Sequence, residues 1–341
     1  MKYLAFALLI LSITFSCKEN EQKEDGNCPD QAQIIDSIKD GEKLYLLTSQ
    51  GDIWLNQGSG CSFYDQYFEP DFLSKNYLID GNNIFHLWEG GQKINIKKTL
   101  ADDFENYQQY TDIFISGVED TAKNWMDMVL LSPAFPTIDA YVSLRKCIMN
   151  HTCNFVDNRI DLSADPVNSA NKAIKFFSIA PTSSMITAKS SIENTLLFAD
   201  RGDEVNYEAR YYISKGMPET ILDLENKWFD ESPGIRLMLL NDDYLVAELK
   251  YGLKPLYRQI GTTNIGFPKN QWVKLKVYFL LDCNSNGIVK VWQNDVLIID
   301  QKGQTLPTSN SIQTNIEIGI TACDQETEMY MDDVKVSVIK H

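Results

Sequence analysis

Histidine is scarce in this chain of 341 residues, which carries only His86, His151 and His341, and its cysteines form no CxxC pair. Zinc sites usually combine these ligands at short spacings, so we expect no metal site of this kind. Positive charge is also scarce, and the formal net charge is −16. Because nucleic-acid binding requires a basic surface, we expect no nucleic-acid partner. An acidic surface that keeps an exported protein soluble explains the charge better.

The apolar run near the start of the chain, Leu4–Phe15, is too short to cross a bilayer. Lys2 precedes the run and the small residue Ser16 ends it, which predicts a signal peptide over residues 1–16. The end of the run resembles a bacterial lipoprotein signal, in the looser form found in Bacteroidetes-like lipoproteins. This resemblance implies that Cys17 carries lipid, palmitate included, and anchors the protein to a membrane.

The segment after Cys17 extends the same interpretation. Its first residues, Lys18-Glu-Asn-Glu21, resemble the acidic tag that sends some of those lipoproteins to the outer face of the outer membrane. We therefore expect a lipid-anchored protein exposed on the cell surface. Residues 17–26 are charged, have nothing apolar to bury and end in glycine, so they predict a flexible tether.

Six cysteines remain once Cys17 is assigned to lipid. An even number of cysteines in an exported chain predicts disulfide bonds. Fifteen pairings are possible, and local pairs close the shortest loops. We therefore expect the bonds Cys28–Cys61, Cys147–Cys153 and Cys283–Cys323.

Alternation of apolar and polar residues is the strongest pattern present. Every second residue between Trp272 and Leu281 is apolar, which is the period of a half-buried strand. Turn residues follow at Asp282–Gly287 and at Asn294-Asp295, and the alternation returns at Ile316–Ile320 and Val334–Val338. This pattern predicts an all-β fold in which an antiparallel meander forms part of a jelly-roll sandwich.

The length of the chain, 341 residues, predicts two folded regions. Short strands separated by glycine-containing turns predict a small β-rich module over residues 27–100. Residues 101–341 are expected to form the sandwich domain. No repeat of fixed period occurs, so a propeller is not supported.

In the second region, the alternation of side chains between the two faces of each predicted strand gives a candidate ligand-binding face. The side chains expected on it or just beyond it are Arg210, Tyr212, Arg236, Glu248, Lys250, Tyr257, Arg258 and Gln259. The density of Arg, Tyr, Glu, Lys and Gln between positions 248 and 259 favours a functional groove. The alternative is a solvent-facing surface that binds nothing, since polar residues occur wherever one face of a sheet meets water.

Several segments of the same region together resemble the heparinase-type polysaccharide lyase family. They are Asp102-Asp-Phe-Glu105, Lys172-Ala-Ile-Lys-Phe176, Pro233-Gly-Ile-Arg236, Glu248–Gln259, Trp272-Val-Lys-Leu-Lys276, Gly287-Ile-Val-Lys-Val-Trp292 and Tyr330-Met-Asp-Asp-Val334. The resemblance covers roughly residues 101–340 and implies a concanavalin A-like jelly roll. Binding modules share that scaffold with lyases, so the resemblance is more specific for fold than for activity.

The same resemblance implies a β-elimination on a uronic-acid polymer. Related jelly-roll lyases carry a Lys-x-Gly-x-Tyr-x-Gln strand whose tyrosine acts as acid and base. Lys250, Gly252, Tyr257 and Gln259 are similar to it, with three extra residues between the glycine and the tyrosine. The resemblance therefore implies catalytic roles for Lys250, Tyr257 and Gln259. The expected substrate-binding residues are Arg210, Tyr212, Arg236, Glu248 and Arg258. The family's second catalytic group is usually a histidine, and this region has only His151 and His341.

The turn Asp282–Gly287 matches the first half of a calcium loop. Its twelfth position is Gln293 rather than a bidentate glutamate, and strands rather than helices flank it. An ordinary turn explains these residues, so we expect no metal and no cofactor, with calcium a minor alternative.

Three functions remain open from the sequence. The first is a surface lipoprotein that recognises an extracellular, uronate-containing polysaccharide, with partners in a glycan-uptake complex. The second is a polysaccharide lyase. The third is a structural or adhesion lipoprotein that binds no sugar.

Overall fold

The structure is a computed structural model of the chain. It describes residues 28–30, 34–40, 43–48, 52–56, 60–66, 77–80, 83–87, 92–120, 122–135, 138–183, 185, 187–225, 234–240, 243–250, 254–261, 264–307 and 311–341. Cys17 and the predicted signal peptide and tether lie outside these residues. Within the described ranges, no helix combines the length and apolar character required to cross a membrane.

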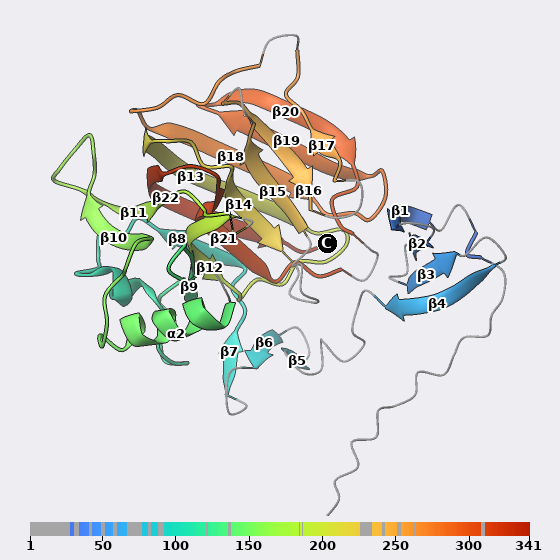
Figure 1. Cartoon of the computed structure of the whole chain (residues 1–341), viewed down its shortest axis with the longest axis horizontal. Coiled ribbons are helices and arrows are strands. Elements are labelled where there is room, and N and C mark those ends of the chain that lie inside the picture. The colour runs from blue at the N-terminus through green and yellow to red at the C-terminus, as the bar shows by residue number, and fades with distance from the viewer. Residues whose placement is uncertain are drawn as a thin grey trace, which may run out of the picture.

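Two antiparallel sheets dominate the structure, so the predicted all-β sandwich is confirmed (Figure 1). The seven-stranded sheet has the order β17-β16-β15-β14-β21-β12-β9. Its strands are β9 (Asp127–Leu131), β12 (Ala188–Asn194), β14 (Thr220–Glu225), β15 (Gly234–Leu239), β16 (Leu245–Leu249), β17 (Leu256–Tyr257) and β21 (Asn315–Cys323).

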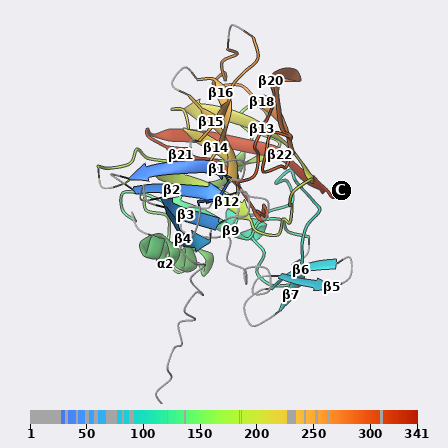
Figure 2. The same ribbon diagram turned by 90° about the vertical axis from the view of Figure 1, so that its right-hand side faces the viewer.

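The eight-stranded sheet has the order β10-β11-β22-β13-β18-β19-β20, and β8 also pairs with β22. Its strands are β8 (Thr99–Asp102), β10 (Arg159–Ala164), β11 (Lys172–Ser178), β13 (Glu204–Lys215), β18 (Val273–Leu280), β19 (Gly287–Gln293), β20 (Val296–Gly303) and β22 (Thr327–Ile339). In Figure 2 the two sheets are seen from the side, with β14, β15, β16 and β21 to the left of β13, β18, β20 and β22.

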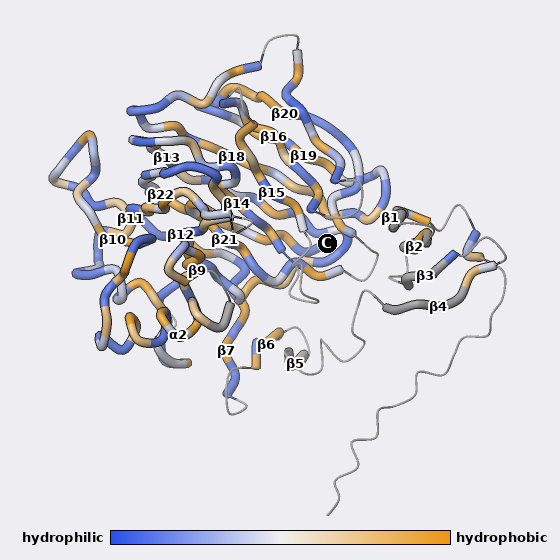
Figure 3. Tube along the Cα trace, in the orientation of Figure 1, coloured by the Kyte–Doolittle hydropathy of each residue, from blue (hydrophilic) through white to orange (hydrophobic). Residues whose placement is uncertain are grey.

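Alternating residues explain why these strands form a sandwich. In β13 and β18 every second residue is buried, and the residues between are partly exposed. Tyr207, Ala209 and Tyr211 belong to one continuous apolar core with Ile318 and Leu237 of the other sheet. Apolar residues follow the strands of both sheets in Figure 3. Burial of these inner faces is the main stabilising contribution to the fold.

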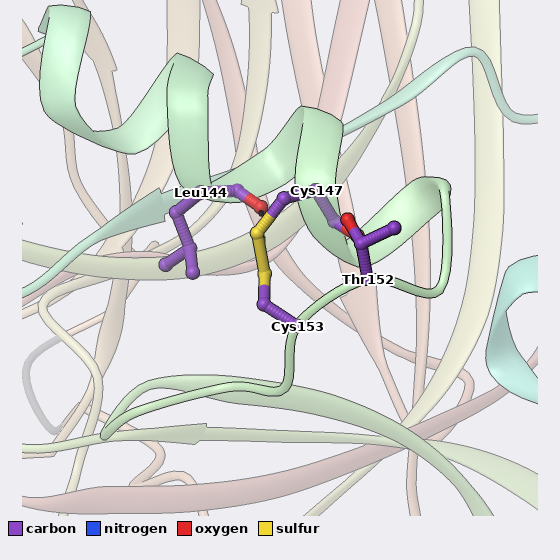
Figure 4. The surroundings of a disulfide bond; sticks show 4 residues. All are labelled: Leu144, Cys147, Thr152 and Cys153. Atoms are coloured by element: carbon purple, nitrogen blue, oxygen red, sulfur yellow. Dashed lines mark hydrogen bonds between the residues drawn. A yellow bond between two sulfur atoms is a disulfide. The ribbon is translucent and has the colours of Figure 1, made fainter.

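Helix α2 (Ile138–Met149) contacts β9 at the edge of the seven-stranded sheet. Its Leu144 and Ile148 are buried in the main core. Cys147 near its end is bonded to Cys153, as predicted, and Figure 4 shows this bond beside Leu144 and Thr152. The disulfide closes the turn that ends the helix.

The first part of the described chain forms two smaller sheets. One contains β1 (Ile34–Asp40), β2 (Lys43–Thr48), β3 (Asp52–Asn56) and β4 (Cys61–Gln66), and the other contains β5 (Tyr77–Asp80), β6 (Asn83–Leu87) and β7 (Lys93–Asn95). The predicted Cys28–Cys61 bond is confirmed at the start of β4. Ile94 of β7 packs against Ile115 and Leu196 of the sandwich region. The domain boundary near residue 100 stays a prediction, and β8 already pairs with the sandwich strand β22.

The predicted Cys283–Cys323 bond is wrong, because both thiols are free and buried. Cys283 follows Leu281, whose backbone contacts Asp203 just before the start of β13. Cys323 ends β21 next to Ala322, which pairs with Thr220, five residues after the end of β13. The 12 residues of β13 separate these two ends by about 40 Å. Cys283 and Cys323 therefore lie at opposite ends of the sandwich. Their separation in the sequence gave no sign of this, because it does not show at which end of the sandwich each strand ends.

The turn between β18 and β19 satisfies its own polar groups. Asp282 accepts a hydrogen bond from the Asn284 backbone at 2.8 Å and pairs with Arg201 at 3.2 Å. Asn284 accepts a hydrogen bond from the Asn286 amide at 3.0 Å. These contacts are those of an ordinary polar turn.

Candidate functional site: a charge cluster on the seven-stranded sheet

One row of charged residues crosses the outer face of the seven-stranded sheet. Cross-strand pairing places Glu193, Glu317, Asp223, Arg236 and Glu248 directly opposite one another on β12, β21, β14, β15 and β16. Apart from Asn194 beside Glu193, their neighbours in each strand are buried apolar residues, so alternation directs the charged side chains away from the core. At the edge, Glu193 pairs with Asp127 of β9, which contacts Arg145 of α2 at 2.8 Å.

A second set of polar residues lies beside this row. Asn315 of β21 pairs with Glu225 of β14, and its amide donates to Glu225 at 3.2 Å and to Glu193 at 3.3 Å. Lys250 directly follows β16, and its backbone N–H donates to Gly234 at the start of β15. We call the following nine residues the charge cluster: Lys189, Glu193, Asp223, Glu225, Arg236, Glu248, Lys250, Asn315 and Glu317.

Each basic residue of the charge cluster contacts a carboxylate. Lys189 Nζ lies 3.2 Å from Glu317, and Arg236 Nε donates to Glu248 at 2.7 Å. Lys250 Nζ lies 3.0 Å from Asp223 Oδ1 and also contacts Glu225. Asp223 Oδ1 makes no well-directed hydrogen bond despite that distance, so we interpret its contact with Lys250 as a purely electrostatic one. The basic groups therefore stabilise carboxylates that burial would otherwise make unfavourable.

The basic side chains are the outermost members of the charge cluster. The side chains of Lys189 and Arg236 are 22% and 21% exposed, whereas that of Glu317 is 4% exposed. The side chain of Lys250 is 15% exposed, whereas that of Asp223 is only 3% exposed. The side chains of Lys189, Arg236 and Lys250 are therefore more exposed than the carboxylates that they contact.

Burial and charge push the pKa values of the carboxyl groups apart. Burial, together with the carboxylates of Glu225 and Asp223, raises the pKa of Glu317 to about 7, against the opposing effect of Lys189. Burial would also raise the pKa of Asp223, but Lys250 and Lys189 hold it below its usual value. Groups whose pKa values are separated in this way are typical of acid–base sites.

The two lysines of the cluster are held in their charged form. Burial lowers the pKa of Lys189, but Glu317, Glu225 and Asp223 more than reverse that effect and raise it. Burial likewise lowers the pKa of Lys250, and Asp223 and Glu225 raise it overall. Both lysines therefore act as cations at neutral pH.

Three carboxylates of the cluster are close enough to hold a metal ion. Oxygen atoms of Asp223, Glu225 and Glu317 all lie within 4.8 Å of one another. Lys189 and Lys250 already contact these carboxylates and supply the positive charge that such a site requires. The arrangement is therefore complete as an ion-pair network without a metal.

The structure brings together three of the residues that the sequence predicted for the site. Arg236 and Glu248 occupy the row, and Lys250 lies beside it. Arg258 lies past β17, where its guanidinium contacts the Tyr244 hydroxyl at 3.3 Å rather than the charge cluster. Gly252, the remaining member of the lyase-like motif in this segment, lies outside the described residues.

Tyr257 and Gln259 do not face the charge cluster. Tyr257 pairs with Ala247 and is buried in the core, where its hydroxyl donates to the Gln304 carbonyl. Burial raises the pKa of Tyr257 to about 12. The Gln259 amide donates to the Ile265 carbonyl at 3.0 Å and accepts from its N–H at 2.7 Å, so it fixes a loop.

Arg210 and Tyr212 belong to β13 and therefore lie on the eight-stranded sheet. Arg210 pairs with Asp332 and stacks over the Trp272 ring at 4.7 Å. Tyr212 makes an edge contact with the same ring at 5.7 Å. These two predicted residues are thus on the other sheet from Arg236, Glu248 and Lys250.

Sequence analysis missed the centre of the charge cluster. Asp223 and Glu225 alternate with Leu222 and Leu224 in β14, which is the signal that identifies an outward polar pair. Lys189 and Glu193 lie in β12, a segment with no clear period. Glu317 lies among isoleucines that the sequence identified only as core.

Comparison with known proteins gives remote structural likeness alone. No family model matches the chain, and no curated protein matches it. Among solved structures, an endo-β-1,4-glucuronan lyase from the fungus Trichoderma reesei is 12% identical, with 53% of this chain and 87% of that chain covered and a TM-score of 0.43.

Two further solved structures are alginate lyases. Aly36B is 9% identical, with 72% of this chain and all of that chain covered and a TM-score of 0.39. A marine PL-14 alginate lyase from Aplysia kurodai is 12% identical, with 61% of this chain and 97% of that chain covered and a TM-score of 0.35. These structural neighbours are polysaccharide lyases. Likeness this remote gives no information about activity here, so function has to be inferred from the charge cluster itself.

Proposed function

We propose that the charge cluster binds a uronate-containing polysaccharide and that the protein is a polysaccharide lyase acting by β-elimination. The observation that carries this proposal is the position of Lys189, Arg236 and Lys250, which lie outermost over buried carboxylates. An anionic sugar would meet these cations first, even though the protein as a whole is acidic. Uronate carboxylates match guanidinium and ammonium donors in both charge and geometry.

The chemistry of β-elimination assigns roles to the cluster. A cation must neutralise the uronate carboxylate so that the adjacent proton becomes acidic, and Arg236 and Lys250 are suited to this task. Glu317, with a pKa of about 7, is the group that accepts the proton beside the carboxylate. Lys189 donates a proton to the leaving glycosidic oxygen. Glu317 then passes the proton that it took from the sugar to Lys189 across 3.2 Å, so that Glu317 is again ionised and Lys189 again carries its charge.

A second function, glycoside hydrolysis, is favoured by one specific observation. The oxygens of Glu317, Asp223 and Glu225 lie within 4.8 Å of one another, and the pKa of Glu317 is raised while that of Asp223 is lowered. Hydrolysis of a glycosidic bond uses such a pair, one neutral acid and one ionised carboxylate. Three outward cations are not needed for a neutral sugar, so we rank hydrolysis below elimination.

The narrower assignments remain part of this proposal. We infer a heparinase-type lyase in a lipoprotein anchored through Cys17 at the outer face of the outer membrane, with partners in a glycan-uptake complex. The sequence pattern over residues 1–21 supports the anchor. Replacing Cys17 with Ser should release the protein in soluble form. Membrane fractionation after a salt wash measures this, and a Cys17→Ser protein that stays with membranes would contradict the anchor.

The test of activity uses alginate, glucuronan and heparin as probes with the chain from residue 17 onward. A lyase produces unsaturated uronate ends that absorb ultraviolet light, whereas a hydrolase produces reducing ends without that absorbance. We expect absorbance to rise with at least one of the three polymers. Reducing ends alone would favour hydrolysis, and neither product would contradict both activities.

A matched pair of variants then locates the site. Arg236→Met removes an outward cation of the charge cluster, and Arg210→Met removes an arginine of the other sheet. We expect Arg236→Met to weaken uronate binding by at least about tenfold, because a partly buried charge contact is lost. Arg210→Met should leave binding within about twofold. Equal effects of the two changes, with both proteins folded by circular dichroism, would place the site elsewhere.

A further inference from the structure

A hollow lies on the outer face of the eight-stranded sheet, on the opposite side of the sandwich from the charge cluster. Its volume is about 720 Å³, and it extends across β8, β22, β13, β18 and β19. Cavities of this size accommodate small ligands or short stretches of a polymer. The side chains that matter for its chemistry are Asn206, Glu208, Lys276, Tyr278, Trp292 and Lys335.

Strand register brings these side chains into two adjacent rows. Glu208 of β13 lies opposite Lys276 of β18, which lies opposite Trp292 of β19. In the next row, Asn206 lies opposite Tyr278. The residues that alternate with them point into the core, so both aromatic rings are directed to the outer face and are half-buried there.

The hollow is close to electrically neutral. Its lining contains two acids, Glu208 and Asp295, and two bases, Lys276 and Lys335. Lys276 Nζ lies 3.0 Å from Asp295, and Glu208 lies 3.0 Å from Lys274 at the border of the hollow. Lys335 lies opposite Glu208 in the strand register, so acids and bases alternate across this hollow.

We propose that this hollow binds an uncharged stretch of glycan, with the rings of Trp292 and Tyr278 as the stacking surface. Trp and Tyr offer a large apolar face together with a polar edge, which suits the apolar faces and hydroxyl rims of neutral sugars. Asn206 and Ser337 provide amide and hydroxyl groups that can hydrogen-bond to sugar hydroxyls. The two acids and two bases of the lining sum to zero net charge, so the hollow does not favour a polyanion over an uncharged sugar. This site does not depend on the proposed activity of the charge cluster.

Affinity electrophoresis and calorimetry with uncharged oligosaccharides test the proposal. The probes are hexasaccharides of β-1,4-glucan, β-1,3-glucan, β-1,4-mannan and β-1,4-xylan, and oligoguluronate serves as the charged counterpart. We expect at least one neutral hexasaccharide to bind the wild-type protein, and Trp292→Ala to raise its Kd by about tenfold or more. Trp292→Phe keeps an aromatic face and should retain most of the affinity. Lys290→Ala changes the same strand and the same face outside the hollow, and should leave Kd within about twofold.

The outcomes separate this site from the charge cluster. Arg236→Met should not change the affinity for neutral hexasaccharides, because it lies on the other sheet. Failure of all four neutral probes to bind would overturn the proposal, as would unchanged affinity in Trp292→Ala. Competition by oligoguluronate for the same site would also overturn it, since it would indicate a ligand selected by charge. If Trp292→Ala does not fold, Tyr278→Ala takes its place and should raise the Kd of the neutral hexasaccharide, whereas Trp292→Phe should retain most of the affinity. Unchanged affinity in Tyr278→Ala would then overturn the proposal.

Discussion

The two outer faces of the sandwich are built by the same alternation, but the row through Glu208 and the row through Glu317 differ in the charges that lie opposite one another. On the eight-stranded sheet, Glu208 lies directly between Lys276 and Lys335, so opposite charges face each other across the strands. On the seven-stranded sheet, Glu193, Glu317 and Asp223 lie directly opposite one another. Opposite charges at such positions stabilise a sheet, and like charges destabilise it.

This difference indicates which face was shaped by something other than stability. A row of three carboxylates is unfavourable, and the fold retains it by placing Lys189 and Lys250 over them. Such locally unfavourable arrangements are concentrated at functional sites, where the strain serves the chemistry. The eight-stranded face carries no comparable conflict along the Glu208 row. Its aromatic hollow is therefore better suited to recognition than to catalysis.

The largest expected effect tests whether a cation contributes more to the free energy of unfolding on the seven-stranded face than on the eight-stranded face. Lys250→Met would leave Asp223 and Glu225 buried without their main cation, so we expect the free energy of unfolding to fall by about 3–5 kcal/mol. Lys274→Met, on the other face, breaks the exposed pair with Glu208 and should cost less than about 1 kcal/mol. Urea denaturation of both variants measures the two values. Losses of equal size would remove the energetic distinction between the faces.

The second effect is a pH dependence of the free energy of unfolding that arises from Glu317 on the seven-stranded face. The pKa of Glu317 is raised from 4.5 to about 7, mainly by burial. A carboxyl group with a raised pKa contributes stability that is fully present below pH 4.5 and is lost as the pH rises to about 7, because the unfolded state ionises first. The difference in unfolding free energy between Glu317→Gln and wild type should therefore increase by about 2–3 kcal/mol from pH 4.5 to pH 8.

Denaturation of both proteins at several pH values checks this change. Trp292→Phe on the other face removes no titratable group and is the control. A Glu317→Gln protein whose stability follows that of wild type at every pH would mean that Glu317 is ionised throughout this range. Glu317 could not then be the group that titrates near neutrality in the proposed site.

Sequence patterns predicted the faces of individual strands but not how the strands are placed beside each other. Alternation within each of two strands correctly put Arg236 and Glu248 on the polar face, and the structure pairs them there. The same reasoning could not show that Arg210 belongs to the other sheet, since the order of strands depends on long-range pairing. Glu317 escaped notice because one charged residue among isoleucines gives little signal before its neighbours across the sheet are known.

Tyr257 illustrates the limit of spacing arguments most clearly. The bend around Pro255 lets Leu256 pair with Glu248 and Tyr257 pair with Ala247. Leu256 therefore takes the outward position, and the tyrosine enters the core. A motif read along the chain gives the separation of residues in sequence, whereas the face of each residue is set by its cross-strand partner.

The smallest expected effect tests this placement. Tyr257→Phe removes one buried hydroxyl that donates to the Gln304 carbonyl, and the ring itself stays in the core. We expect the free energy of unfolding to fall by about 1 kcal/mol, the usual cost of one lost hydrogen bond. Polysaccharide turnover should stay within about twofold of wild type, because the hydroxyl lies on the core side of the sheet whose outer face carries the charge cluster. Urea denaturation and the ultraviolet assay measure the two quantities on the same preparation. A folded Tyr257→Phe protein without turnover would make Tyr257 the proton-transfer group and would move the site from the charge cluster to the end of β17.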